Sequence, residues 1–174
     1  MKLKFSTSKI LCVLIFSSFL ITQLVDAPWN RDGWVVKSDI KGYYAYLPAL
    51  FINNDLKLED LSVYEDENGL RIWYKETDKG VRYIKYSIGT PILYAPFFGL
   101  GHAFAWFSGH KQDGFSKPYL VALCMSSLFY LLLALIFLRK TLLLYFSESV
   151  VALTLLVIFF GTNVWNYFTF DACF

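Results

Sequence analysis

One uncharged stretch limits what this chain can fold into. Residues 119–138 read YLVALCMSSLFYLLLALIFL, contain no charged side chain, and are followed directly by Arg139-Lys140. A helix needs about 20 predominantly apolar residues to cross the hydrocarbon core of a bilayer. The stretch has this length and ends at two basic residues, so it predicts a transmembrane helix over 119–138.

Composition supports a membrane protein. Of the 174 residues, 56% are hydrophobic and 17% are charged, whereas a soluble domain has about 25% charged and about 45–50% apolar residues. So much apolar surface cannot be buried inside one small globule, and we therefore expect membrane lipid as a partner. The net charge of +2 is too small to suggest nucleic-acid binding, so no nucleic-acid partner is expected.

Two further apolar stretches are predicted to be transmembrane helices. Residues 10–27 follow three lysines near the start of the chain, and residues 149–170 end in aromatic side chains typical of a membrane interface. For 10–27 the alternative is a cleaved signal peptide ending at Val25-Asp26-Ala27. Valine is a poor fit there, because the cleavage site needs a small residue.

The charges lie mainly between these stretches. Residues 26–87 contain 11 acidic and 9 basic side chains. Segments rich in lysine and arginine stay in the cytoplasm. We therefore expect residues 1–9 and 139–148 in the cytoplasm, residues 28–118 on the external face, and residues 171–174 on the external face at a truncated end.

Residues 88–107 are apolar enough to cross a membrane but contain Pro91 and Pro96. Prolines inside a helix leave carbonyl groups unpaired, which is unfavourable in contact with lipid. We therefore expect a helix at the membrane surface; the alternative is a fourth span. The predicted fold class is an α-helical integral membrane protein with three transmembrane helices, or four in the alternative, and an external loop holding juxtamembrane helices and a small β-meander.

The external loop contains two recognisable patterns. Residues 40–53 are rich in tyrosine and leucine and predict a short amphipathic helix at the membrane surface. Asp39 precedes this helix at a position where a carboxylate commonly caps an N-terminus. Residues 61–86 alternate apolar and polar side chains around Asn68-Gly69, a strong hairpin signal, and predict the β-meander.

No metal site is predicted from the cysteines and histidines. All three cysteines lie in apolar stretches and are interpreted as buried small hydrophobic residues: Cys12, Cys124 and Cys173. His102 lies in an aromatic stretch and is typical of a hydrogen-bonded packing residue, while His110 is expected to be solvated. The sequence has no P-loop or other nucleotide-binding motif.

The order of these features resembles the N-terminal part of the polytopic glycosyltransferases of the C superfamily. The nearest type is family 39, with the protein mannosyltransferases and the lipid A aminoarabinose transferase. The resemblance is carried by a first span, then Asp39-x-x-x-Tyr43-Tyr44-x-Tyr46, then Gly89-x-Pro91-x-Leu93-x-x-x-Phe97-Phe98, then further spans. The sequence departs from the family pattern at Ile40, where a second acid is common, and no lysine adjoins Pro91.

The resemblance implies a multi-pass transferase of a bacterial inner membrane that takes a sugar from a polyprenyl-phosphate donor and passes it to an unidentified acceptor. Asp39 and Asp171 match external acids of the family and are the candidate catalytic residues, with Asp39 as general base. The candidate ligands of the donor phosphate are Lys85, Lys41 and Arg82. The candidate substrate-binding residues are Tyr43, Tyr44 and Pro91. No cofactor is implied, and a divalent metal ion stays open.

Relatives of this kind have many more spans, so we expect this chain to be a fragment without transfer activity of its own. Two other classes of function remain as alternatives. A non-catalytic scaffold or subunit would not need Asp39. A transporter fragment would place charged residues inside the spans, and none occurs within 119–138 or 150–169.

Overall fold

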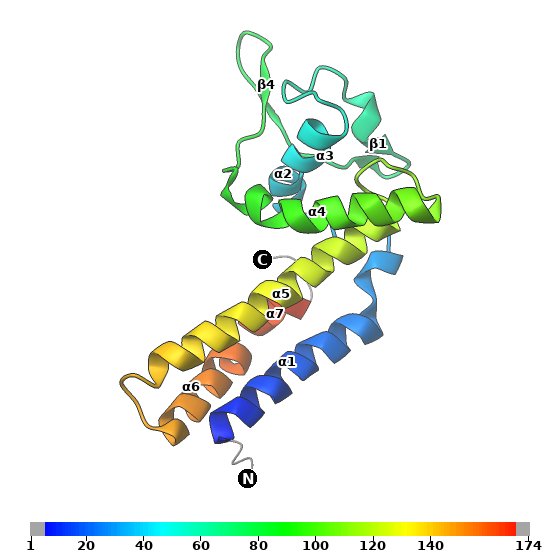
Figure 1. The fold of residues 1–174 in the computed structure, drawn as a ribbon. Coiled ribbons are helices and arrows are strands. Elements are labelled where there is room, and N and C mark those ends of the chain that lie inside the picture. The colour runs from blue at the N-terminus through cyan, green and yellow to red at the C-terminus, as the bar shows by residue number, and fades with distance from the viewer. Residues whose placement is uncertain (1–5, 170–174) are drawn as a thin grey trace. The chain divides into compact units, whose positions relative to one another are not determined.

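The computed structural model describes residues 6–169. It is mostly helical, with 63% of residues in helices, and it divides into two compact units whose elements are labelled in Figure 1. Unit 1 comprises the residues up to 27 together with those from 126 onward, and unit 2 comprises residues 28–125. Helix α5 (Lys117–Leu142) contributes its first turns to unit 2 and its remainder to unit 1.

Two helices within residues 6–169 are long and apolar enough to cross a membrane. One is α1 (Thr7–Asp26), extended by a short 3-10 turn (Pro28–Asn30), and the other is α5. They contain nearly all of the predicted span 10–27 and all of the predicted span 119–138. By length and composition, the mostly helical chain agrees with the membrane class expected from the sequence.

An aromatic cluster forms the centre of unit 1. Helices α6 (Glu148–Gly161) and α7 (Val164–Thr169) both pack against α1. The ring of Phe19 on α1 is fully buried, 4.6 Å from the ring of Trp165 and 6.4 Å from that of Phe159. The side-chain amide of Gln23 donates a hydrogen bond of 2.9 Å to the carbonyl of Phe168. Aromatic packing and this hydrogen bond hold α7 on α1.

The single uninterrupted helix predicted over 149–170 is wrong within the described residues. Helix α6 ends at Gly161, and α7 starts at Val164 after Thr162 adopts an extended conformation. Glycine is a poor helix former. The Thr162 hydroxyl also donates to the Ile158 carbonyl at 2.6 Å and accepts the Val164 N–H at 3.3 Å, so it competes with the regular backbone bonds.

Four polar side chains, here called the polar clasp, join the start of α1 to the end of α5 and the start of α6. The Arg139 guanidinium donates to the hydroxyls of Ser8 at 2.6 Å and Ser6 at 2.9 Å, and it lies 3.4 Å from the Glu148 carboxylate. The Ser8 hydroxyl donates to the same carboxylate at 2.8 Å. Hydrogen bonds from Ser6 and Ser8 lower the pKa of Glu148 to about 2, so this carboxylate is ionised at neutral pH.

Unit 2 is built on three helices. In place of the single helix predicted over 40–53, the structure has α2 (Ile40–Tyr44) and α3 (Tyr46–Phe51), and both pack on α4 (Gly89–Ser108). The buried face of α4 repeats at helical spacing: Pro91, Tyr94, Phe98, Gly101 and Ala105. A Cβ atom at Gly101 would lie 3.0 Å from the backbone of Tyr119, so glycine lets α5 approach α4 closely.

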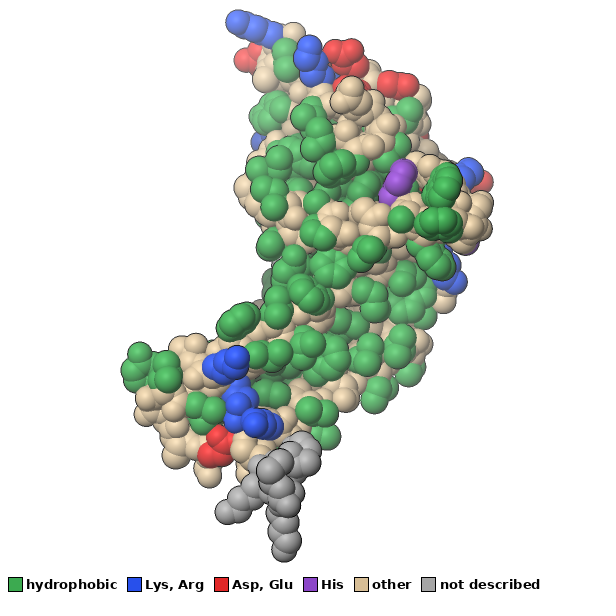
Figure 2. All heavy atoms as spheres, viewed as in Figure 1, with side chains coloured by type: hydrophobic (Ala, Val, Ile, Leu, Met, Phe, Trp, Pro, Cys, Tyr) green, Lys and Arg blue, Asp and Glu red, His purple; other side chains and the backbone are tan. Residues whose placement is uncertain are grey.

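The other face of α4 is apolar and exposed. Five large side chains along it are between 62% and 79% exposed: Ile92, Leu100, Phe104, Trp106 and Phe107. Pro96, in the interior of α4, is also exposed. Proline has no backbone N–H, so the carbonyl of Ile92 lacks its usual helical partner, and Ile92 is exposed as well. Figure 2 shows hydrophobic side chains over much of the visible surface of the helices. This face fits the surface helix predicted over 88–107, and α4 is not among the helices long and apolar enough to span a membrane.

The β-meander predicted over 61–86 is instead two separate hairpins, preceded by a 3-10 turn (Ser62–Tyr64). Strands β1 (Glu65–Asp66) and β2 (Gly69–Leu70) pair around Glu67-Asn68, and β3 (Lys75–Glu76) pairs with β4 (Arg82–Tyr83). The turn at Asn68-Gly69 is therefore present. The chain between β2 and β3 leaves the ladder because Ile72 is fully buried and the Trp73 N–H bonds to the Lys41 carbonyl at 3.4 Å, on α2.

Candidate functional site

The side chain of Asp39, the predicted general base, is hydrogen-bonded to a tyrosine rather than to the backbone N–H groups of α2. It occupies the N-cap position of α2, but its side chain makes no capping bond, so the capping interpretation is wrong. Its Oδ1 atom accepts a hydrogen bond of 2.7 Å from the hydroxyl of Tyr86. This bond raises the pKa of Tyr86 to about 12, because ionising the phenol would remove the donor and place two negative charges together. Asp39 is exposed and stays accessible to solvent.

The tyrosine-rich motif around Asp39 positions Tyr86. The ring of Tyr86 lies directly against Gly42, where any Cβ atom would overlap it, and 4.7 Å from the ring of Tyr43. Tyr46 donates a hydrogen bond of 2.7 Å to the Tyr86 carbonyl. Three positions of the motif besides Asp39 therefore contact one residue that lies about 40 positions away in sequence. We refer to Asp39, Gly42, Tyr43, Tyr46, Trp73, Lys85 and Tyr86 as the Tyr86 cluster.

Lys85, a predicted ligand of the donor phosphate, belongs to this cluster. Its ammonium lies 4.6 Å from the ring centre of Tyr86 and 5.9 Å from that of Trp73. Contacts of this kind attract a cation to an aromatic face without neutralising its charge. The structure thus brings together three of the predicted site residues, namely Asp39, Tyr43 and Lys85.

Two predicted substrate-binding residues are core residues instead. Tyr44 is 1% exposed, and its hydroxyl donates to the carbonyl of Gly114. Pro91 is buried in the first turn of α4, where a proline has no helical N–H bond to lose. Both side chains are buried, so their surroundings give no support to the predicted substrate-binding role.

Arg82 lies elsewhere, at the second hairpin. Its guanidinium donates to the carbonyls of Leu58 at 2.8 Å and Glu59 at 3.1 Å, and it lies 3.9 Å from the Glu76 carboxylate. These bonds fix the chain preceding the hairpins, so Arg82 is a structural residue here rather than a free phosphate ligand. Asp171, the second predicted catalytic acid, lies outside the described residues.

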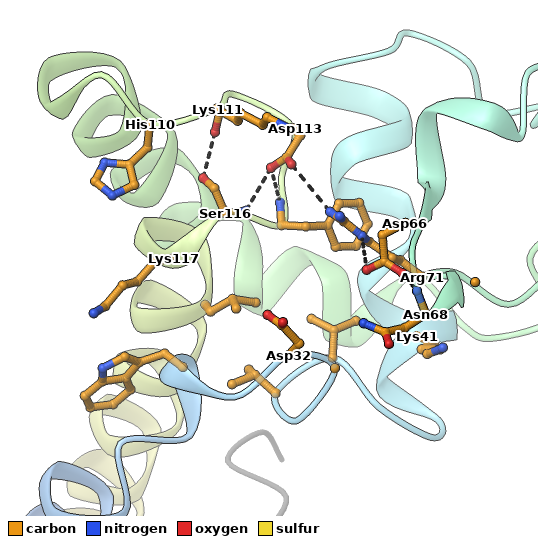
Figure 3. A pocket seen from close by; sticks show the side chains of 17 residues that line it. Asp32, Lys41, Asp66, Asn68, Arg71, His110, Lys111, Asp113, Ser116 and Lys117 are labelled. Carbon is orange, nitrogen blue, oxygen red and sulfur yellow. Dashed lines mark hydrogen bonds and ion pairs between the residues drawn. The ribbon is translucent and has the colours of Figure 1, made fainter.

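The remaining predicted phosphate ligand, Lys41, lines a polar pocket of about 410 Å³ in unit 2. Figure 3 shows the pocket's charged side chains on the segment before α2, on α2, on the first hairpin, in the loop after α4 and at the start of α5. Five are basic or imidazole groups, and three are carboxylates: Lys41, Arg71, His110, Lys111, Lys117, Asp32, Asp66 and Asp113. Asp39 does not line this pocket, although it lies two residues before Lys41.

Arg71 forms ion pairs with two of the three carboxylates in the polar pocket. Its guanidinium lies 2.8 Å from Asp66 and 3.4 Å from Asp113, and it covers the ring of Phe115 at 5.0 Å. Asp113 also accepts the backbone N–H groups of Phe115 and Ser116, each at 2.8 Å. Asp32 is exposed, and its carboxylate points toward the middle of the pocket (Figure 3).

The lysines of the polar pocket differ in how they are held. Lys41 donates to the carbonyl of Leu70 at 2.8 Å, which leaves its charge uncompensated. Lys111 and Lys117 are exposed. Lys41, Lys111 and Lys117 are thus available to an anion at different places along the pocket, while the Arg71 charge is already balanced by two aspartates.

An apolar groove of about 690 Å³ adjoins the polar pocket. This α4–α5 groove is lined by Phe97, Leu100, Gly101, Phe104, His110, Lys117, Pro118, Val121, Ala122 and Met125. His110 and Lys117 line both the groove and the pocket. The imidazole of His110 is hydrogen-bonded to the Ser108 hydroxyl at 2.8 Å. His102 instead bonds to the Tyr119 hydroxyl at 2.6 Å, as expected of a packing residue.

Several residues of the polar pocket were not singled out from the sequence, among them Asp32, Arg71, Lys111 and Lys117. One available signal was the polar run GHKQDGFSK between two apolar helices, which places two lysines at the boundary. Arg71 and Asp66 gave no such signal, because a hairpin with mixed charges looks like a solvated surface. Only the fold brings them to Asp113.

No family model, no curated protein and no solved structure matches this chain. The likeness to glycosyltransferases therefore depends on the order of the predicted spans and on short motifs around Asp39, Pro91 and Asp171 in the sequence. What the site can do has to be argued from its geometry.

Proposed function

We propose that this protein is a membrane glycosyltransferase, or the N-terminal part of one, that transfers a sugar from a polyprenyl-phosphate donor to an acceptor. The proposal includes an inner-membrane location with several spans and a cytoplasmic N-terminus. Unit 2 then lies on the external face, with the apolar face of α4 resting on lipid. The motif resemblance and the geometry of unit 2 support this function.

One observation carries the proposal: the polar pocket and the α4–α5 groove share His110 and Lys117. A polyprenyl-phosphate sugar consists of an apolar chain, a charged phosphate and a polar sugar, in that order. The groove, the shared cation and the pocket follow the same order. Ligand sites of this kind combine apolar lining with a few charged groups that fix orientation.

The charged residues of unit 2 fit the chemistry of transfer. A carboxylate takes the proton of an acceptor hydroxyl, whose oxygen forms a bond to the anomeric carbon of the sugar. The bond from that carbon to the phosphate oxygen breaks, and polyprenyl phosphate leaves with the electron pair. Lys41 and Lys117 offset the additional negative charge on the departing phosphate.

Asp39 is our candidate for the base. It is exposed, it does not cap α2, and the bond from Tyr86 to Oδ1 fixes the orientation of the carboxylate. Asp32 is the competing candidate, because it lies within the pocket and points toward its middle. The two assignments predict different variants to be inactive.

The proposal is tested by photo-crosslinking. The full chain in lipid nanodiscs is exposed to polyprenyl phosphate with a benzophenone on its first isoprene units, and cross-linked peptides are mapped by mass spectrometry. We expect cross-links within 97–104 and 118–125. The Lys117→Gln variant should reduce them several-fold, while Lys79→Gln, in the exposed turn between β3 and β4, should leave them unchanged.

Three outcomes contradict the proposal. They are cross-links outside these two segments, equal labelling by the polyprenol without phosphate, and a loss of labelling in Lys79→Gln as large as that in Lys117→Gln. Any of these results means that the groove and its shared cation do not recognise a lipid phosphate.

A non-catalytic scaffold or subunit is the second candidate function. It is favoured by the Tyr86 cluster, in which Asp39, Gly42, Tyr43 and Tyr46 all contact Tyr86 and thereby stabilise unit 2. A scaffold requires only that these contacts hold the fold. An Asp39→Asn variant, which keeps a hydrogen-bond acceptor for Tyr86, should then retain full function in cells that depend on the protein.

A further inference from the structure

A second apolar groove lies in unit 1, between α1 and the later part of α5. This α1–α5 groove has a volume of about 710 Å³ and is lined by Lys9, Ile10, Cys12, Val13, Leu14, Phe16, Leu132, Leu135, Ile136, Arg139 and Lys140. Eight of the eleven lining residues are apolar. The three others are all cationic, and they come from the first residues of α1 and from the last turns of α5.

The groove lies between helices that make little contact with each other. Helix α1 packs mainly on α6 and α7, through Phe19 and the residues around it. The outer face of α1 remains uncovered at the groove: Val13 is 63% exposed and Leu14 is 60% exposed. Side chains of this size on a helix long enough to cross a membrane are suited to contact with acyl chains.

The cations at the end of the groove are not equally available. Arg139 belongs to the polar clasp, where Ser6, Ser8 and Glu148 hold its guanidinium. Lys9 and Lys140 are exposed, and within residues 6–169 the ammonium group of neither one forms a hydrogen bond or an ion pair. Together with Glu148, the three cations give the described residues at this end a net charge of +2. Figure 2 shows basic side chains gathered at one end of the helices.

We propose that the α1–α5 groove binds one anionic phospholipid, with its acyl chains along the apolar lining and its phosphate at Lys9 and Lys140. Two features of the groove select this occupant. The positive end requires an anionic headgroup, and the apolar lining requires hydrocarbon chains that a free phosphate does not have. Basic pockets at the cytoplasmic ends of transmembrane helices recognise anionic headgroups in this way.

Arg139 has a positioning role in this site. Its bonds to Ser6 and Ser8 tie the start of α1 to the end of α5, so the clasp sets the distance between Lys9 and Lys140. The site depends on unit 1 alone. It does not require that the protein transfer a sugar, and it does not involve the polar pocket of unit 2.

The test measures protection of Cys12, which lies inside the groove. In a Cys173→Ser background, maleimide labelling reports mainly on Cys12, because Cys124 is fully buried. The full chain in neutral detergent is titrated with dioleoyl phosphatidylglycerol or with dioleoyl phosphatidylcholine. We expect phosphatidylglycerol to slow labelling at much lower concentrations than phosphatidylcholine does.

Charge variants identify the headgroup contact. Each lysine near an anionic lipid contributes about five-fold in affinity, so Lys9→Gln with Lys140→Gln should weaken protection by phosphatidylglycerol about thirty-fold. A matched control, Lys57→Gln with Lys79→Gln, removes the same charge from exposed sites in unit 2 and should change nothing. Circular dichroism checks that all variants keep their helices.

A pair of tryptophan variants identifies the acyl-chain contact. Val13→Trp should fill the groove and reduce the number of phosphatidylglycerol adducts in native mass spectra. Val25→Trp places the same ring on α1, at a site that is 81% exposed and does not line the groove, and should leave the adducts unchanged.

Each remaining outcome overturns the proposal. Equal protection by both lipids means that the groove is an ordinary lipid-facing surface. Unchanged preference in the double lysine variant means that the headgroup binds elsewhere. Protection by glycerol phosphate without acyl chains means that a free phosphate, rather than a phospholipid, occupies the site.

Discussion

The hydroxyl of Tyr86 donates a hydrogen bond of 2.7 Å to the carboxylate of Asp39, and the two residues lie 47 positions apart. The bond joins the start of α2 to the chain between β4 and α4. It makes Asp39 part of the fold of unit 2 as well as the candidate general base. Substituting Tyr86 therefore tests only the structural role of this bond. Substituting Asp39 removes the bond's acceptor and the candidate general base together.

Alkaline titration should detect this bond. The pKa of Tyr86 is about 12 in the folded protein, above its ordinary value of 10.0, because Asp39 accepts its proton in a hydrogen bond. A raised tyrosine pKa stabilises the fold fully below pH 10, and this stability is lost as the pH rises from about 10 to about 12. Absorbance at 295 nm should show one tyrosine fewer ionising near pH 12 in Tyr86→Phe. An identical titration of both proteins would contradict the prediction.

Gly42→Ala should destabilise unit 2 by about 1–3 kcal/mol, because the added methyl group overlaps the ring of Tyr86 and forces it away from Asp39. Thermal unfolding monitored by circular dichroism measures the change. Gly99→Ala is the matched control, since a Cβ atom at this exposed position in α4 meets no atom within 4 Å. Helix propensity alone would make both alanine substitutions stabilising, so a Gly42→Ala protein as stable as the Gly99→Ala protein would contradict the role of Tyr86.

The polar clasp should make unit 1 sensitive to acid. Its hydrogen bonds lower the pKa of Glu148 from 4.5 to about 2, so the stability they confer is complete above pH 4.5 and is lost as the pH falls toward 2. Glu148→Gln should remove this pH dependence from the helical signal in detergent. Glu67→Gln, in the exposed turn of the first hairpin, should preserve it.

Two aspartate variants separate the candidate bases. In membranes where the protein supports transfer, Asp39→Asn should lower release of polyprenyl phosphate from its hexose conjugate by about 10²–10⁴-fold, the usual contribution of a general base. Asp32→Asn should have a smaller effect, through binding in the pocket. The opposite order of effects would assign the base to Asp32, and unchanged release in Asp39→Asn would favour the scaffold function.

Periodicity and hydropathy were enough to predict the three longest helices α1, α4 and α5, because apolar runs such as 119–138 determine where a helix forms. They did not predict the break at Thr162, which depends on one hydroxyl that bonds to the backbone on both sides. The meander was wrong for a similar reason. Alternating apolar and polar residues indicate an extended chain. Here Ile72 is buried, so the chain after β2 packs against α2 and does not continue the same sheet as a third strand.

The candidate site was predictable only where neighbouring residues define it. The motif around Asp39 identified the carboxylate and Tyr43, but Tyr86 lies on a different segment, and nothing in its local sequence links it to α2. The charges of the polar pocket likewise come from five separate segments of the chain. Such long-range juxtapositions depend on tertiary packing, which a single sequence does not reveal.

The interruption after Gly161 also has a consequence for bilayer thickness. At 1.5 Å per residue, the 14 residues of α6 extend about 21 Å, whereas the hydrocarbon region measures about 30 Å. In the proposed arrangement with several spans, the bilayer around α6 has to thin locally or admit water to Thr162 and Asn163, and either distortion raises the elastic energy of the lipid. Lipids with short acyl chains should therefore hold the α6 segment with less strain than long-chain lipids do.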